Sequence, residues 1–366
     1  MRSILRILLA AIFLASGFVK AVDVIGFSFK LEEYFSPAVF NLPFFERQAL
    51  PLAITVVITE LVFGWMLLIK SRLKLTIIVL IAMCIFFAFL TFYSAYFNVV
   101  TDCGCFGDAL TFTPWQSFWK DIALLSGLMT LAYSHRTDLK NPGRENQKKW
   151  FATLPALFLM IFIIYWGIAH EPLIDFRDYK IGTNLNKEKK KIAQNPSDYK
   201  TFYTVNNTKT GEMKELDQDE YVSDKKYWAA DSPWTIDESK TVSRMTRQGY
   251  DSEISKFKPE SQEGKDLTDE ILNAPKAILI CVYDPKNVNH SLLSELENAV
   301  KKNNDASIYG ISTDPSVFKQ IAKGTMDGTA IKTIARSNPF VLTLQRGTIV
   351  GKQGANDYIK QKKNKQ

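Results

Sequence analysis

Side chains that bind metals or form disulfides are scarce in this sequence, which has 4 cysteines and 3 histidines among 366 residues. His135, His170 and His290 lie far apart in the chain, and a closed zinc site needs about four nitrogen or sulfur ligands. The histidines therefore give no metal-binding motif, and we assign no metal-ligating residue. The net charge of +7 comes mostly from basic residues in the loops between the apolar stretches and in the tail from Lys360 to Lys365, so we expect no nucleic-acid partner.

Charged residues are nearly absent from five apolar stretches, each long enough to cross a bilayer. A helix rises about 1.5 Å per residue, so about 20 apolar residues span the hydrocarbon core. We expect the first stretch to be a retained helix rather than a cleaved signal peptide, because four further spans follow it. The polar break at 71–74 predicts a tight helical hairpin. The predicted spans are Ile4–Ala21, Leu52–Leu68, Leu75–Phe97, Trp115–Ser134 and Trp150–Ile168.

The positions of lysine and arginine predict how these spans are oriented. Cytoplasmic loops carry an excess of basic residues, so the more basic side of the alternating topology is inside. This places the N-terminus in the cytoplasm and the part of the chain after His170 outside, in the periplasm of a Gram-negative cell. We expect a multi-pass protein of the bacterial inner membrane, with the lipid bilayer as a partner. The basic residues of the inner side are Arg2, Arg6, Lys70, Arg72, Lys74, Arg136, Lys140, Arg144, Lys148 and Lys149.

A pair of cysteines, Cys103 and Cys105, is the most informative feature of the chain. It belongs to the motif Cys103-Gly104-Cys105-Phe106-Gly107, between the apolar runs Leu75–Val99 and Trp115–Tyr133. The predicted topology puts this loop in an oxidising compartment, where disulfides persist. A disulfide ring this small is strained, and strained exposed disulfides are often exchangeable. The motif fits a redox-active pair, a permanent structural disulfide or part of a metal site.

Several charged residues lie within or at the ends of the predicted spans. Glu60 is well inside the second span, where an unpaired carboxylate is costly, so it is a candidate functional residue. Lys120 and Asp121 lie near the outer end of the fourth span, and we predict that Lys120 pairs with Glu60. Lys20 closes the first helix at the outer face. The following segment, 26–40, fits an interfacial helix, and we expect Cys84 in the third span to be inert.

The polar half of the chain divides into two regions. Residues 170–250 form a connecting region that contains a predicted hairpin, Tyr199–Val205 with Glu212–Leu216, and a solvated lysine-rich stretch, Asn186–Gln194. Residues 251–366 alternate between strand and helix patterns. There we predict strands at 254–257, 277–283, 307–311, 338–344 and 348–350, and helices at 267–272, 291–303, 315–323 and 356–359.

This order of elements, with Pro339 just before the last hairpin, resembles the thioredoxin fold. The resemblance implies that Pro339 is a cis-proline beside a redox site. Thioredoxin-like enzymes carry Cys-x-x-Cys after the first central strand, but here 283–290 contains no cysteine. Cys281 lies inside the strand and reads as a buried apolar residue. The domain therefore looks like a thioredoxin scaffold without its dithiol, which favours binding over catalysis.

The N-terminal region resembles the DoxX/MauE group of bacterial membrane proteins. The motifs are Ser16-Gly17-x-x-Lys20-x-x-Asp23, Glu60 with Gly64, and the Cys103–Cys105 loop before a tryptophan-rich helix. The resemblance implies a four-helix bundle over residues 1–134, then a basic loop (135–149), a fifth helix (150–169) and the periplasmic regions described above. DoxX and MauE take their names from pathways such as methylamine dehydrogenase maturation.

We therefore expect a multi-pass helical bundle followed by an α/β thioredoxin-like domain. The first functional hypothesis is assistance to periplasmic redox or protein maturation, in which Cys103 and Cys105 exchange disulfides or electrons, with a quinone of the bilayer as a candidate carrier. The alternative is a non-catalytic assembly protein, anchored by the bundle, whose thioredoxin-like domain binds a periplasmic or membrane protein.

Overall fold

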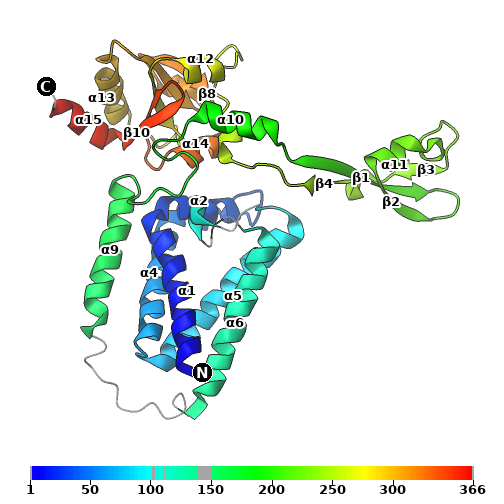
Figure 1. The fold of residues 1–366 in the computed structure, drawn as a ribbon, viewed down its shortest axis with the longest axis horizontal. Helices are drawn as coiled ribbons and strands as arrows, with labels where there is room; N and C mark the ends of the chain where they lie inside the picture. The colour runs from blue at the N-terminus through cyan, green and yellow to red at the C-terminus, as the bar shows by residue number, and fades with distance from the viewer. Residues whose placement is uncertain (1, 101–103, 105, 111, 138–150, 365–366) are drawn as a thin grey trace. The chain divides into compact units, whose positions relative to one another are not determined.

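The computed structural model describes residues 2–100, 104, 106–110, 112–137 and 151–364 (Figure 1). The chain divides into two compact units. The first contains Met1–Gly182 together with Lys258–Gln366, and the second contains Thr183–Phe257.

The N-terminal part of the first unit is a group of apolar helices (Figure 1). Its main packing contacts join α1 with α4, α5 with α6, and α9 with both α1 and α4. Small residues allow the close approach, since a Cβ added at Gly17 would lie 2.9 Å from the Leu61 side chain. The helices are α1 (Arg2–Val22), α2 (Val24–Phe35), α3 (Pro43–Arg47), α4 (Ala49–Leu68), α5 (Leu73–Phe97), the 3₁₀ turn η1 (Gly107–Ala109), α6 (Pro114–Ser134) and α9 (Thr153–Ala169).

Among the described residues, three helices are long and apolar enough to cross a membrane: α1, α4 and α5. They correspond to the first three predicted spans, and the hairpin between α4 and α5 is confirmed. The fourth and fifth predicted spans are not confirmed by this criterion. Helix α6 contains polar residues in its first half, among them Lys120 and Asp121, and α9 has only 17 residues.

The segment after α1 forms the helix α2, which is shorter than the predicted interfacial helix 26–40. Asp23 ends α1 and caps α2, because its side chain accepts a hydrogen bond from the Gly26 amide. Helix α2 packs against α4, and most of its apolar residues are buried. It is therefore part of the protein core rather than only a surface anchor.

The C-terminal part of the first unit, residues 258–364, is a mixed α/β domain with a six-stranded sheet, in the order β10-β9-β6-β7-β8-β5. Strands β6, β7 and β8 are parallel, whereas β9 is antiparallel to β6 and β10. The elements are β5 (Glu260–Ser261), α12 (Thr268–Asn273), β6 (Ala277–Val282), α13 (His290–Lys301), β7 (Ser307–Ser312), η5 (Pro315–Val317), β8 (Ala322–Thr325), α14 (Gly328–Ile334), β9 (Phe340–Gln345), β10 (Thr348–Gly354) and α15 (Ala355–Lys363).

Two of the elements predicted for residues 251–366 are wrong. The strand at 254–257 is a 3₁₀ turn, η4 (Glu253–Lys256), whose first turn is capped by the Ser252 side chain. The helix at 315–323 is only the short η5, followed by β8. Phe318 packs over Gly310 of the sheet, and residues 322–325 pair with β7. Sheet pairing therefore overrides the local helical pattern.

The second unit is a small sheet with short helices. The predicted hairpin is confirmed by antiparallel pairing of β1 with β2, and β3 and β4 also pair with β1. The lysine-rich stretch forms a helix, α10, capped by Asn184. The elements are α10 (Leu185–Gln194), β1 (Asp198–Asn207), β2 (Met213–Asp217), α11 (Gln218–Ser223), η2 (Lys225–Tyr227), β3 (Trp234–Ile236), η3 (Glu238–Lys240), β4 (Val242–Arg247) and η4.

Candidate functional site

A buried ion pair joins α1 to α4. The Lys20 ammonium lies 2.8 Å from a carboxylate oxygen of Glu60, and the two side chains are 2% and 5% exposed. Lys20 also donates a hydrogen bond to the Ser16 hydroxyl, 2.7 Å away. Its ammonium lies 5.6 Å from the ring centres of Phe27 and Phe87. The prediction that Glu60 pairs with Lys120 is therefore wrong, because packing of α1 on α4 brings Lys20 to Glu60 instead.

A second ion pair lies on α6. The Lys120 ammonium is 2.9 Å from a carboxylate oxygen of its neighbour Asp121. The Asp121 side chain is almost fully buried, and it also accepts a weak hydrogen bond of 3.4 Å from Thr91 on α5. The Lys120 ammonium and the Thr91 hydroxyl thus offset the cost of burying the Asp121 carboxylate in an apolar bundle.

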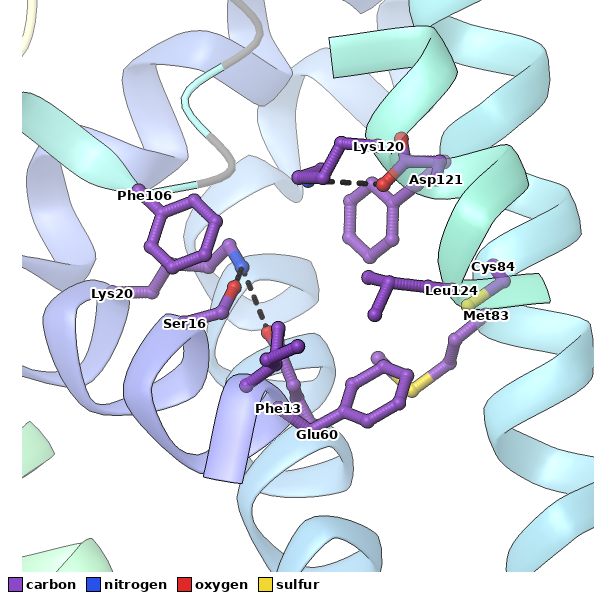
Figure 2. Close-up of a pocket in the computed structure, with 12 residues that line it drawn as sticks. Phe13, Ser16, Lys20, Glu60, Met83, Cys84, Phe106, Lys120, Asp121 and Leu124 are labelled. Carbon is purple, nitrogen blue, oxygen red and sulfur yellow. Dashed lines mark hydrogen bonds and ion pairs between the residues drawn. The ribbon is translucent and has the colours of Figure 1, made fainter. Parts of the chain in front are cut away.

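Both ion pairs line one cavity inside the helices (Figure 2). Figure 2 shows the two pairs at separate places in its wall, which also includes apolar side chains such as Phe13 and Leu124. The cavity measures about 20 Å³, which is on the order of one water molecule. Cys84 lines it as a buried free thiol.

Phe106 connects this cavity to the cysteine loop. Its ring forms part of the cavity wall, and the Lys120 ammonium lies 5.4 Å from the ring centre. Gly104, between the two cysteines in sequence, is buried with φ +63°, a conformation that glycine adopts readily. A Cβ at this position would lie 2.9 Å from Cγ of Lys30 on α2. Cys103 and Cys105 themselves lie outside the described residues.

The α/β domain presents a different candidate site, at the loop after β6 and the loop before β9. Cys281 is fully buried in β6, and burial raises the pKa of its thiol to about 12, so the thiol stays protonated at neutral pH. The Asn338–Pro339 peptide bond is cis. The Asn338 side-chain amide donates a hydrogen bond of 2.7 Å to the Asp284 carbonyl. This ties the loop after β6 to the loop before β9.

Sequence reasoning missed a group of buried charges between the segment after α9 and the α/β domain. Arg177 is 4% exposed and donates hydrogen bonds to Glu171, to Asp175 and to the Ile334 carbonyl. Lys352 on β10 lies 2.5 Å from Asp175. Burial, followed by the nearby Arg177 charge, lowers the pKa of Lys352 to about 8. The distance of these residues along the chain explains why no local motif signals the cluster.

The described residues offer no cluster of three or more histidine, cysteine or acidic side chains that could hold a metal ion. In the described part of the bundle, two lysines face two carboxylates at this cavity.

The comparison with protein families matches residues 1–134 to the methylamine utilisation protein MauE. Neither the curated proteins nor the solved structures show a match to the chain. The family match and the three apolar helices fit a membrane protein. The match ends with α6, so it covers the cavity and the cysteine loop and leaves out the α/β domain.

Proposed function

We propose that this protein assists the maturation of periplasmic proteins by exchanging disulfides through Cys103 and Cys105. The similarity of residues 1–134 to MauE supports this proposal, because methylamine dehydrogenase maturation is the role associated with that family. In this proposal, the N-terminus is cytoplasmic, and the cysteine loop and the α/β domain face the periplasm of an inner-membrane protein.

The position of Phe106 is the observation that carries the proposal. Phe106 directly follows Cys105 and forms the wall of a buried cavity that holds two lysine–carboxylate pairs. The Lys120 ammonium lies 5.4 Å from the centre of the Phe106 ring, next to Cys105 in the sequence. A nearby cation stabilises a thiolate, which is both the nucleophile and the good leaving group of exchange reactions. We assign Lys120 this positioning role for the cysteine pair.

The exchange step is balanced without a further reagent. A thiolate of a partner protein attacks one sulfur of the Cys103–Cys105 disulfide, the bond between the two sulfurs breaks, and a mixed disulfide forms. A second partner thiolate then attacks the mixed disulfide and releases the cysteine. Two electrons pass from the partner to Cys103 and Cys105, the partner gains a disulfide, and the thiol protons pass to the released thiolates.

The α/β domain supports the exchange without a dithiol of its own. We assign it the thioredoxin-like fold, which agrees with the parallel β6–α13–β7 unit, the antiparallel β9–β10 hairpin and the terminal helix α15. Since its one thiol is buried, the domain binds rather than reacts. The same observation favours a second candidate function, in which the cysteine pair is a structural clip and the domain binds a partner protein during assembly.

A redox titration separates the two functions. Full-length protein in lipid nanodiscs is equilibrated in graded glutathione buffers, and free thiols are counted by mass tagging. We expect a midpoint between about −230 and −180 mV, the range of glutaredoxins and disulfide isomerases. Lys120→Met should lower the fraction of reactive thiolate at neutral pH, whereas Lys70→Met, on the opposite side, should not change it. A disulfide that stays oxidised below about −300 mV, with full function in a Cys103→Ser, Cys105→Ser double variant, refutes the redox function.

A further inference from the structure

Helices α1 and α9 end side by side. A Cβ added at Gly167 of α9 would lie 2.8 Å from the carbonyl oxygen of Val22, the last residue of α1. Helix α1 is long and apolar enough to cross a membrane, so this end of α9 lies near the same bilayer surface. Tyr165 and Trp166 belong to the last turns of α9, and both residue types are enriched at the boundary between membrane and water.

Two polar contacts attach the α/β domain to these helix ends. Asp23 directly follows α1, and its carboxylate lies 2.8 Å from Nε of Arg336, which follows α14. His170 directly follows α9, and its Nδ1 lies 2.9 Å from the carboxylate of Asp357 on α15. The first turn of α15 is therefore held at the bilayer surface, against the end of α9.

The segment that follows α9 exposes apolar side chains close to this surface. Leu173 and Ile174, four and five residues after the helix ends, are 51% and 45% exposed. Arg177 donates hydrogen bonds to Glu171 and to Asp175, which fixes the shape of the segment between them. Exposed apolar residues beside the end of a membrane helix fit contact with lipid better than contact with water.

Lysine side chains lie on α15 close to its contact with α9. Lys360 is exposed and follows Asp357 by three residues, so it lies on the same side of the helix and about 4.5 Å further along the axis. Lys363 is one turn further, and its ammonium lies 2.9 Å from the carboxylate of Glu295 on α13. These two side chains are 70% and 50% exposed, so their ion pair contributes little and the lysine can bind another anion.

Both lysines line an open cleft of about 300 Å³ between α13 and α15. Its polar groups are two ammonium groups, two side-chain amides and one carboxylate. The ammonium and amide groups can donate hydrogen bonds to the oxygens of a phosphate, and the carboxylate already has a lysine partner. The residues of the cleft are Glu295, Asn356, Ile359, Lys360, Lys363 and Asn364.

We propose that this cleft binds the phosphate of an anionic phospholipid, and that α15 and the segment after α9 form a membrane-contact surface of the α/β domain. Lys360 and Lys363 bind the headgroup, while Leu173 and Ile174 contact the apolar region beneath the headgroups. A phospholipid fits better than free phosphate, because the cleft begins one turn from the point where α15 meets the end of a membrane helix. The proposal depends neither on the cysteines nor on disulfide exchange.

Hydrogen exchange of α15 tests this in the full-length protein in lipid nanodiscs. Nanodiscs of phosphatidylcholine alone are compared with nanodiscs in which a third of the lipid is phosphatidylglycerol. We expect the anionic lipid to slow exchange in α15 by at least about fivefold, the factor that one lysine contributes at an anionic surface. In Lys360→Gln with Lys363→Gln, the ratio of the two rates should fall to about one. Each variant is compared with itself in two lipids, so an effect of the substitutions on the stability of α15 cancels.

Two further variants sharpen the comparison. Lys258→Gln with Lys265→Gln removes the same charge near β5, at the opposite edge of the sheet from β10, and should leave the ratio unchanged. Lys265 is a matched residue, because it also forms an exposed ion pair with a glutamate. Glu295→Gln removes the carboxylate that competes for Lys363, so it should increase the ratio.

Three results would overturn the proposal. Equal exchange of α15 in the two kinds of nanodisc would refute lipid binding, and a ratio that survives in Lys360→Gln with Lys363→Gln would assign the lipid to another part of the chain. Millimolar inorganic phosphate added to the phosphatidylcholine nanodiscs separates the two sources of phosphate. If it slows exchange in α15 as much as phosphatidylglycerol does, the cleft is a site for free phosphate and the membrane-contact surface is wrong.

Discussion

Replacing Lys20 or Glu60 with methionine removes one member of an ion pair buried between α1 and α4. At 2.8 Å the attraction is about 6 kcal/mol for an effective dielectric constant of about 20. Much of this offsets the desolvation of the two charges, so the pair itself adds little stability compared with apolar residues. Removing Glu60 leaves the Lys20 charge buried, with the Ser16 hydroxyl still accepting a hydrogen bond from it. We expect each single variant to lose about 3–5 kcal/mol.

The double variant, Lys20→Met with Glu60→Met, should lose far less than the two single variants together. Methionine is unbranched and fills irregular apolar space, so the pair of methionines can occupy the same volume without a buried charge. We expect the double variant to remain within about 2 kcal/mol of the parent. The coupling energy between the two positions is then at least about 4 kcal/mol.

The assay is equilibrium unfolding of the full-length chain in detergent micelles by titration with sodium dodecyl sulfate, followed by circular dichroism. The matched control combines Glu60→Met with Lys120→Met, because Lys120 pairs with Asp121. The control should be additive within about 0.5 kcal/mol, as expected for residues without a shared contact. If Lys20 and Glu60 are equally additive, the buried pair is wrong; if Glu60 couples to Lys120 instead, the original pairing prediction stands.

Two further predictions concern pH and topology. The pKa of Asp23 is lower in the folded protein than its ordinary value of 3.8. The stability that its ion pair with Arg336 gives to the contact of α2 is therefore complete above that pH and is lost as the pH falls below it. Protection of α2 from hydrogen exchange should therefore decline below about pH 4. Asp23→Asn should weaken the contact of α2 with Arg336 at neutral pH and should remove most of this pH dependence of protection. For topology, an impermeant thiol reagent applied to spheroplasts should label cysteines introduced at Asn206 and Asn356 but not at Asn141, which lies outside the described residues; labelling at 141 without labelling at 356 refutes the orientation.

The contact between α2 and the α/β domain changes how this domain is interpreted. The absence of cysteine from 283–290 indicated a free binding module. In the structure, Tyr283 and Arg336 of the same region contact α2, so a partner that uses this surface must replace an internal helix.

Local patterns in the sequence predicted those features that depend on neighbouring residues. Apolar runs identified α1, α4 and α5, and alternation with a glycine-containing turn identified the β1–β2 hairpin. The pattern failed at β8, because parallel pairing with β7 is a property of the sheet and not of the four residues that form the strand. It also placed Lys120 beside Glu60 from depth in the membrane alone, since depth says nothing about which helices are neighbours.

The sequence by itself determined that the chain has apolar helices, a charged residue at position 60 that needs a partner, and two cysteines beside a bundle. Those conclusions follow from the cost of burying charge and from the length of a helix. Only the tertiary structure decided that Lys20 is the partner, that Phe106 and two ion pairs share one cavity, and that Asp23 meets Arg336 across 313 positions of the chain. These contacts depend on how helices and sheet pack, which no local pattern encodes.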